Sequence, residues 1–169
     1  FGYVTADGQF LISGDLVNLK TGQEITELSR RQLRLDQLAK LGDQYIEFDP
    51  PGGNAHNVVT AFIDVDCGYC RKLHDEMAAY NRLGISLRYY FFPRPGLNTP
   101  NSQQLDAVWC SDDRKAALTR AVNGEKFTAK SCNTPTQAHY ETALKLGVHG
   151  TPLLILPNGE SIPGSVSYT

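Results

Sequence analysis

Two cysteines separated by two residues, Cys67 and Cys70, are the side chains of this sequence best suited to chemistry. A thiolate attacks a disulfide to form a mixed disulfide, and a neighbouring thiol can then resolve it. The spacing therefore predicts thiol–disulfide exchange, with Cys67 as the nucleophile and Cys70 as the resolving thiol. Of the two residues between them, Gly68 is expected to let a substrate approach closely, and Tyr69 to shape the local surface and its dipoles.

The segments on either side of the pair predict how it is positioned. Residues 58–63 form a β-branched, apolar run that is typical of a buried strand. Residues 71–80 have helical spacing, with one apolar face formed by Leu73, Met77 and Tyr80. We therefore expect Cys67, the more exposed of the two cysteines, at the start of a helix, where free N–H groups and the helix dipole favour an anion. Its pKa should then lie below the free-thiol value of about 8.5.

A zinc site and a purely structural disulfide are two alternatives for this pair. Two cysteines at this spacing form half of a common zinc site, but a four-cysteine site usually brings a second close pair. Here the other cysteines, Cys110 and Cys132, are separated by 21 residues. His74, one turn after Cys70, is expected to pack or cap on the helix surface, so we predict no metal and no other cofactor. A structural disulfide is disfavoured because closing so short a loop constrains the unfolded chain little.

A second motif, Thr151-Pro152, lies directly before the apolar run 153–156. Proline cannot donate to a sheet ladder, so Pro152 must open the following strand or lie in a bend. A Thr-Pro step at this place is a candidate for a cis peptide bond. The later Asn158-Gly159 step predicts a hairpin turn.

Together these motifs resemble the bacterial periplasmic disulfide isomerases of the DsbC/DsbG family, and the resemblance covers nearly the whole chain. The dipeptide Gly68-Tyr69 is more similar to DsbC than to DsbG, which has a proline in place of the glycine. The resemblance rests on residues 64–74 around the cysteine pair, residues 80–85 with the strand ending at 92–94, residues 108–110 with 131–132, and the proline loop 146–152.

The resemblance implies an α/β, thioredoxin-like fold with a helical insertion for residues 44–169. Before it, the family has a linker helix, expected here over 26–43, and a small N-terminal β-rich (α+β) dimerisation domain, of which residues 1–25 resemble only the last part. Residues 26–41 have helical spacing, with Gly42 as a stop. A packed surface helix of the catalytic domain is the alternative for this segment.

Three short strands are expected in the N-terminal part. Residues 2–5 and 9–12 flank Asp7-Gly8 and predict a hairpin, residues 15–19 predict a third strand, and Thr21-Gly22 predicts a turn. A disordered remnant is the alternative for this part. The sequence has no initial Met and no helical period in its last five residues, where thioredoxin folds normally end with a helix. We therefore expect it to be a mature, cut or partly ordered version of a longer protein.

The second cysteine pair bears on the cellular compartment. Cys110 follows a helical segment, and Cys132 precedes Pro135, which suits the first turn of another helix. The resemblance implies a structural disulfide between the two, which would tie down the helical insertion and stabilise the fold by very roughly 3 kcal/mol. Such a bond needs an oxidising compartment, and the family resemblance implies the periplasm. Two reduced, buried thiols in a cytosolic protein are the alternative.

The resemblance also implies the reaction and its partners. Cys67 would attack a wrong disulfide in a misfolded protein, the released thiol would attack another disulfide, and Cys67 would leave as a thiolate. Thr151 and Pro152 would dock the substrate backbone, and a membrane reductase of the DsbD type would keep Cys67 and Cys70 reduced. The family works as a homodimer with chaperone-like binding of its substrates. The carboxylates considered as acceptors for the proton of Cys70 are Glu47, Asp64 and Asp66.

Length and composition agree with such a protein. The 169 residues leave room for one catalytic domain and a small appendage, and 41% hydrophobic residues support an ordinary core. A net charge of −2 does not suggest nucleic acid or an anionic membrane as a partner, and the apolar runs are too short to span a membrane. Two alternatives of other classes are a monomeric net dithiol oxidase or reductase of the same fold, and a non-enzymatic holdase with a structural or metal-bound cysteine pair.

Overall fold

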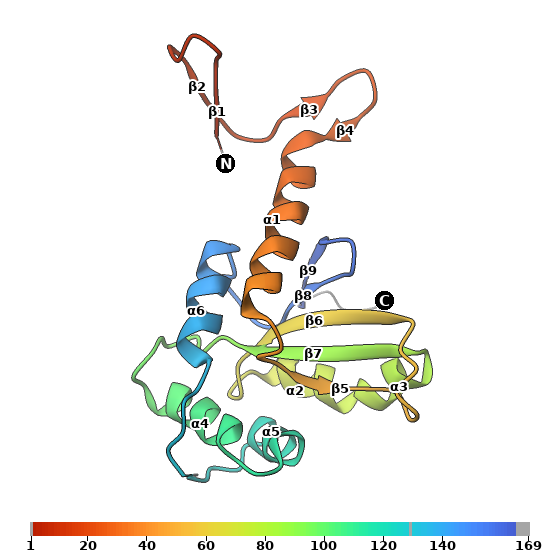
Figure 1. Cartoon of the computed structure of the whole chain (residues 1–169), viewed down its shortest axis with the longest axis vertical. Coiled ribbons are helices and arrows are strands. Elements are labelled where there is room, and N and C mark those ends of the chain that lie inside the picture. Colours follow the sequence, from red (N-terminus) through yellow and green to blue (C-terminus); the bar gives the residue numbers. More distant parts are fainter. Residues whose placement is uncertain (1, 129, 165–169) are drawn as a thin grey trace.

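The computed structural model describes residues 2–128 and 130–164, and the expectation for the last five residues lies outside them. A small β part at the N-terminal end leads through a long helix into an α/β domain (Figure 1). Along the chain the elements are β1 (Gly2–Val4), β2 (Leu11–Ser13), β3 (Val17–Asn18), β4 (Gln23–Glu24), α1 (Ile25–Leu41), β5 (Ile46–Phe48), β6 (Asn57–Ile63), α2 (Gly68–Asp75), α3 (Met77–Arg82), β7 (Ile85–Phe91), α4 (Pro100–Trp109), α5 (Arg114–Val122), α6 (Thr136–Lys145), β8 (Leu153–Ile155) and β9 (Ser161–Pro163).

A mixed sheet in the order β5-β7-β6-β8-β9 forms the centre of the α/β domain. β6 and β7 run parallel, and α2 and α3 provide the crossover that a parallel pair requires. β5, β8 and β9 pair with their neighbours antiparallel. The predicted α/β class is thereby confirmed. The strand predicted over 58–63 is β6, and the Asn158-Gly159 turn joins β8 to β9.

The two faces of the sheet carry separate cores, because neighbouring residues of a strand point to opposite faces. Ala61 and Ile63 of β6 lie in one core, together with Cys67, Cys70 and side chains of α2, α4 and α5. Phe62 lies in the other core, together with side chains of α1 and α6. The cysteine pair therefore lies on the face that the helical insertion covers.

The N-terminal part consists of two small hairpins. β1 and β2 pair antiparallel, as predicted for residues 2–12, while the predicted third strand is reduced to β3. β3 pairs with β4, which the sequence pattern did not predict, and the turn between them includes Gly22 with a φ of 69°. Several large apolar side chains are exposed in this part: Val4, Phe10, Leu11, Ile12 and Leu19.

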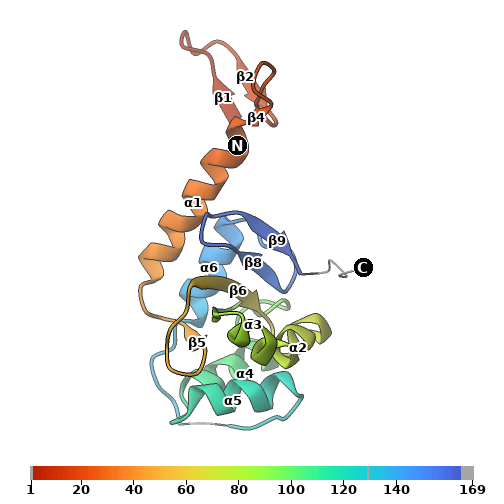
Figure 2. The same ribbon diagram turned by 90° about the vertical axis from the view of Figure 1, so that its right-hand side faces the viewer.

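α1 starts one residue before the predicted helix and ends at Gly42, as predicted. Gly42 has a φ of 56°, which favours glycine, and its N–H bonds to the Ala39 carbonyl to close the last turn. Towards this end the helix packs on the α/β domain through Leu38 and Leu41. The segment is therefore both a connection to the N-terminal hairpins and a packed helix of the domain (Figure 2).

The turn between β8 and β9 holds α1 in this position. Arg34 Nη1 donates a hydrogen bond of 3.0 Å to the Gly159 carbonyl, and Arg31 pairs with Glu160 at 3.1 Å. A Cβ atom on Gly159 would lie 2.5 Å from the backbone oxygen of Arg31. Glycine at the turn therefore permits the close approach of helix and hairpin, in addition to the φ of 80° that the turn requires.

The single helix predicted over 71–80 is wrong, because two helices occupy the segment. α2 ends before Glu76 and α3 starts after it. The predicted apolar face is nevertheless present, since Leu73 lies in the core and Met77 and Tyr80 pack against it.

The helical insertion consists of α4 and α5, between β7 and α6. Thr99 and Ser102 form a capping box at the start of α4. Cys110 and Cys132 form a disulfide with 5.7 Å between their Cα atoms, which joins the end of α4 to the loop before α6. Among the described residues, none of the helices combines the length and apolar character needed to span a bilayer.

One buried histidine connects α6 to the sheet. His139 is fully buried, and its Nδ1 accepts a hydrogen bond of 3.2 Å from the backbone N–H of Phe91. Its ring meets Tyr90 and Trp109 edge-on. Burial lowers the pKa of His139 to about 4, so the ring is neutral in the folded protein near pH 7.

This burial predicts a loss of stability in acid. The unfolded chain protonates the histidine near its ordinary pKa of about 6.5, whereas the folded protein resists protonation down to about pH 4. The free energy of unfolding should fall through this group by on the order of 3 kcal/mol as the pH drops across that window. Urea unfolding at a series of pH values measures the effect. His139→Gln should flatten the dependence and His149→Gln, at an exposed position, should not; the same dependence in His139→Gln would contradict the prediction.

Candidate active site

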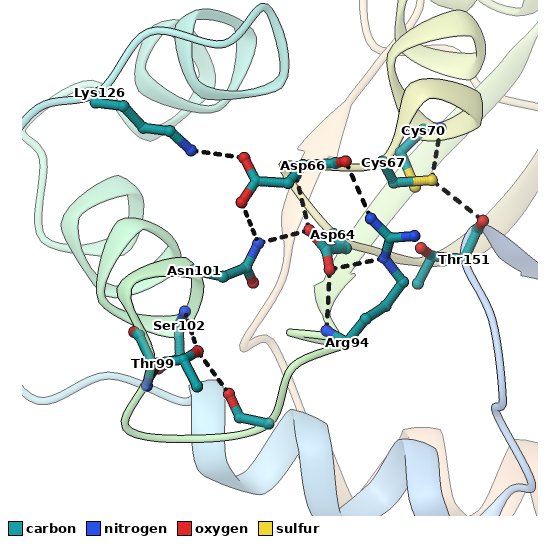
Figure 3. A network of polar contacts seen from close by, with 11 residues as sticks. Asp64, Asp66, Cys67, Cys70, Arg94, Thr99, Asn101, Ser102, Lys126 and Thr151 are labelled. Carbon is teal, nitrogen blue, oxygen red and sulfur yellow. Dashed lines mark hydrogen bonds and ion pairs between the residues drawn. The ribbon is translucent and has the colours of Figure 1, made fainter.

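Cys67 lies where β6 turns into α2, as predicted. It is the N-cap residue of α2, and its Sγ accepts a hydrogen bond of 3.3 Å from the N–H of Cys70. The Cys67 sulfur also lies 3.2 Å from the Thr151 carbonyl, to which the protonated form of the thiol donates (Figure 3). The Cys70 thiol, the Cys70 N–H and the guanidinium of Arg94 lower the pKa of Cys67 to about 5, with the Cys70 thiol the largest contribution, although burial opposes them. The sulfur is therefore a thiolate near neutral pH.

Cys70 titrates in the opposite direction. Burial raises the pKa of Cys70 far above that of a free thiol, and its hydrogen bond with Cys67 adds to the rise. Cys67 and Cys70 are 4% and 1% exposed, so the greater exposure predicted for Cys67 is small. One sulfur is an anion and the other a protonated thiol, a combination that suits two different steps of disulfide exchange.

The proline loop lies beside the cysteine pair. The Thr151-Pro152 peptide bond is cis, and it directly precedes β8. The loop places the Thr151 carbonyl at the Cys67 sulfur (Figure 3). Two segments 84 residues apart in the sequence thus meet at the reactive atom.

The two residues between the cysteines leave space in front of the site. A Cβ atom on Gly68 would meet no other atom within 4 Å. Tyr69 is 59% exposed. The chain's own packing therefore makes no demand for glycine at position 68, and the open space is available to a substrate.

Asp64, one of the carboxylates considered for the proton of Cys70, is completely buried just after β6. Its Oδ1 accepts hydrogen bonds of 2.7 Å from the Asp66 N–H and from the Asn101 side chain. Its Oδ2 accepts hydrogen bonds of 2.9 Å from the backbone N–H and the Nε of Arg94 (Figure 3). These contacts join the Asp64 side chain to the turn before α2, to α4 and to Arg94, which is a structural role.

Glu47 and Asp66 are directed elsewhere. Glu47 lies on β5 between Ile46 and Phe48, which face the core that contains Cys70. Its own side chain therefore points to the opposite face, where it pairs with Arg88 at 3.0 Å. Asp66 pairs with Lys126 at 2.6 Å, and this contact is the largest of those that lower the pKa of Asp66.

Comparison with known proteins agrees with this geometry. Residues 50–169 match the family of thioredoxin-like domains. Over 96% of its length the chain is 37% identical to the thiol:disulfide interchange protein DsbC of Escherichia coli K12 and 36% identical to that of Dickeya dadantii. The chain belongs to the DsbC family. It spans about two thirds of the length of these relatives, 67% and 66% respectively.

Solved structures show the same fold. A disulfide interchange protein from Neisseria gonorrhoeae superimposes with a TM-score of 0.62 at 27% identity, over 72% of this chain and 85% of that one. The catalytic domain of ScsC from Proteus mirabilis superimposes with a TM-score of 0.63 at 21% identity, over 82% of this chain and 92% of that one. The predicted thioredoxin-like fold and the resemblance to the DsbC family are confirmed.

In this DsbC-family site His74 is not on the helix surface, and the prediction that placed it there is wrong. The residue is buried, its Nε2 lies 2.9 Å from Thr119 Oγ1 of α5, and its ring meets Phe48 edge-on. The helical insertion covers this side of α2, and this burial lowers the pKa of His74. Within residues 2–128 and 130–164, no group of three or more His, Cys, Asp or Glu side chains is arranged to hold a metal ion.

Three residues of the site were not singled out from the sequence: Arg94, Asn101 and Lys126. They lie 28, 35 and 60 residues after Asp66, which each of them contacts. Arg94 belongs to a segment that carries the family resemblance, which was the one signal available. No pattern in the sequence marks Asn101 or Lys126, because their roles depend on how the insertion packs.

The two sulfur environments predict an acidic thiol in the reduced DsbC-family protein. The ultraviolet absorbance of the Cys67 thiolate should titrate with a midpoint near pH 5. Cys70→Ala removes the largest of the contributions that lower this pKa, so its midpoint should lie higher. Cys70→Ser keeps a hydroxyl donor and should shift less. A wild-type midpoint at the ordinary thiol value of about 8.5 would contradict the assignment.

Proposed function

We propose that this chain contains the catalytic part of a protein disulfide isomerase, with Cys67 as the nucleophile and Cys70 as the resolving thiol. The observation that carries the proposal is the contrast between the two sulfurs, with the pKa of Cys67 lowered and that of Cys70 raised. A thiolate of low pKa is present at neutral pH and also leaves readily. A buried, protonated Cys70 is slow to displace the substrate, so the thiol of the substrate itself has time to attack.

The reaction then proceeds through one mixed disulfide. The Cys67 thiolate bonds to one sulfur of a wrong substrate disulfide, whose other sulfur leaves as a thiolate. That thiolate attacks a second substrate disulfide, and the exchange continues within the substrate. In the last step a substrate thiolate attacks the substrate sulfur that is bonded to Cys67, which forms a new substrate disulfide and releases the Cys67 thiolate. The substrate keeps its number of disulfides, so this route consumes no oxidant. If shuffling stalls, Cys70 attacks Cys67, the two form a disulfide, and the substrate leaves reduced by two electrons.

We assign substrate docking to the residues around the Cys67 sulfur. Thr151 and Pro152 bring a cis peptide bond to this sulfur, and the space beside Gly68 and the exposed ring of Tyr69 lie on the same turn. An extended substrate segment placed against the proline loop would present its disulfide to the thiolate. The substrates proposed are misfolded proteins with wrong disulfides.

The two cysteine pairs support a proposal for the compartment and for one partner. The Cys110–Cys132 disulfide needs an oxidising environment, and we propose the periplasm. Cys67 and Cys70 must be reduced for shuffling, so the protein needs a supply of electrons in the same place. A membrane reductase of the DsbD type fits this need.

We further propose a homodimer held by the N-terminal part. Residues 1–25 would belong to a dimerisation domain, residues 26–43 to a linker helix and residues 44–169 to the catalytic domain. A two-stranded hairpin such as β1–β2 is marginally stable alone, and here it exposes Leu11 at 71% and Val4 at 64%. Association with a second copy would remove these side chains from water.

Refolding of scrambled ribonuclease tests the proposed activity. Wild-type protein in a mild redox buffer should restore ribonuclease activity, and Cys67→Ser should abolish the effect. Cys70→Ser should keep part of it, because shuffling uses Cys67 alone, and it should accumulate mixed disulfides. A wild type that oxidises dithiols but does not unscramble ribonuclease would contradict the isomerase assignment and favour a net oxidase.

Sedimentation equilibrium tests the proposed dimer. The chain should have a mass of twice 18.6 kDa, and Leu11→Lys should lower it towards the monomer value. Leu83→Lys is the matched control, because Leu83 is 73% exposed but lies after α3 in the α/β domain. A monomeric wild type, or equal dissociation by both variants, would contradict the assignment of the N-terminal part.

A further inference from the structure

An acidic residue directly precedes Cys67 in the sequence. This residue is Asp66, and its side chain is 47% exposed. If its carboxylate turned towards the sulfur, it would disfavour a thiolate there, because like charges raise the free energy of the second anion. Something in the fold must therefore compensate Asp66 if Cys67 is to be a ready thiolate.

The helical insertion supplies this compensation. Lys126, in the loop after α5, lies 2.6 Å from Asp66 Oδ1. Asn101, the second residue of α4, donates a hydrogen bond of 2.8 Å to Asp66 Oδ2. The carboxylate points away from the Cys67 sulfur and towards these two residues (Figure 3).

The same Asn101 amide fixes the direction of the turn. Its nitrogen also donates to the buried Asp64 at 2.7 Å, so one side chain joins the two carboxylates that flank Val65. Arg94 holds the backbone of the turn, since its Nη2 donates a hydrogen bond of 3.0 Å to the Asp66 carbonyl. The Asp66 side chain and main chain are thus both held from outside the turn.

We infer that Lys126 and Asn101 are positioning residues for Cys67, which keep the Asp66 carboxylate turned away from the sulfur and neutralised. The inference rests on the proposed role of Cys67 as nucleophile and deepens it. It assigns to the helical insertion a part in the reactivity of the thiolate, in addition to covering the sheet.

The charges around Cys67 support this assignment. The turn before α2 contributes Asp64 and Asp66, the segment after β7 contributes Arg94, and the insertion contributes Lys126. Cys70 of α2 is protonated, and the loop before β8 carries His149, two residues before Thr151. Arg94 pairs with Asp64 and Lys126 pairs with Asp66, so each acid near the sulfur has its own cation. Removal of Lys126 leaves one acid without its partner.

Titration of the Cys67 thiolate in a set of charge variants tests the inference. Lys126→Ala removes the cation paired with Asp66, so the thiolate fraction at pH 5 should fall by roughly threefold, a modest change because both side chains are half exposed. Asp66→Asn should change the fraction in the opposite direction, and Lys126→Ala/Asp66→Asn should return it close to wild type. Lys126→Arg should retain the wild-type titration. Lys130→Ala, which removes the same charge from the same loop, is the matched control.

The thiolate fraction is expected to change in opposite directions in Lys126→Ala and Asp66→Asn, and this contrast separates an electrostatic role from a merely structural one. Midpoints that do not move in Lys126→Ala and Asp66→Asn would overturn the inference. So would shifts in the same direction in both variants together with a lower melting temperature, since these would indicate a general loosening of the turn. High salt should shrink the difference between Lys126→Ala and wild type, and a difference that does not respond to salt would count against the ion pair.

Failure of the inference can be told from failure of the proposed function. The inference alone fails if ribonuclease unscrambling is present in the wild type and lost in Cys67→Ser, but the charge variants show no titration shifts. That result would refute the role of Lys126 and leave the proposed function standing. A wild type without unscrambling activity would refute the proposed function, whatever the charge variants do to the titration.

Discussion

The buried carboxylate of Asp64 is the interaction on which the site depends. It lies where β6 ends, and it accepts hydrogen bonds from the turn before α2, from the segment after β7 and from α4. A charge removed from water is tolerated only with nearly complete partners, because an unpaired one costs several kcal/mol. The folded state therefore needs all of these donors in place. Together they fix the turn that leads to Cys67 through its own backbone, the segment after β7 and α4.

The two sulfurs show that a displacement of one helical turn is enough to reverse the direction in which the pKa of a cysteine shifts. Both cysteines are buried, and both face the same core. Cys67 is at the N-cap, where a backbone N–H, the Cys70 thiol and the proline loop surround its sulfur. Cys70 lies one turn further in, where burial dominates and its pKa rises. Donors at the helix end, rather than exposure to water, create the difference.

The helical insertion connects features that lie far apart in the sequence. Its disulfide between Cys110 and Cys132 joins α4 to the loop before α6. Its side chains Asn101 and Lys126 reach the turn before Cys67, and Thr119 reaches His74 on α2. The helical insertion thus lies against the turn that leads to Cys67. At the other end, the β8–β9 turn sets the direction of α1 and so the position of the N-terminal hairpins.

The sequence by itself determined several strands and helices and the position of Cys67, because local periodicity and two short motifs predict them. The run 58–63 is a strand, Gly42 ends a helix, and Cys67 occupies the start of α2 because each depends on residues close in the chain. The break at Glu76, the pairing of β3 with β4 and the burial of His74 were missed, since they depend on packing or pairing that the local pattern does not encode. Only the tertiary structure decided which charges surround Cys67. Arg94, Asn101 and Lys126 contact the same turn although they lie 28 to 60 residues after Asp66, because the docking of the insertion brings together side chains that no spacing in the sequence relates. Glu47 points to the far face of the sheet because side chains alternate along a strand.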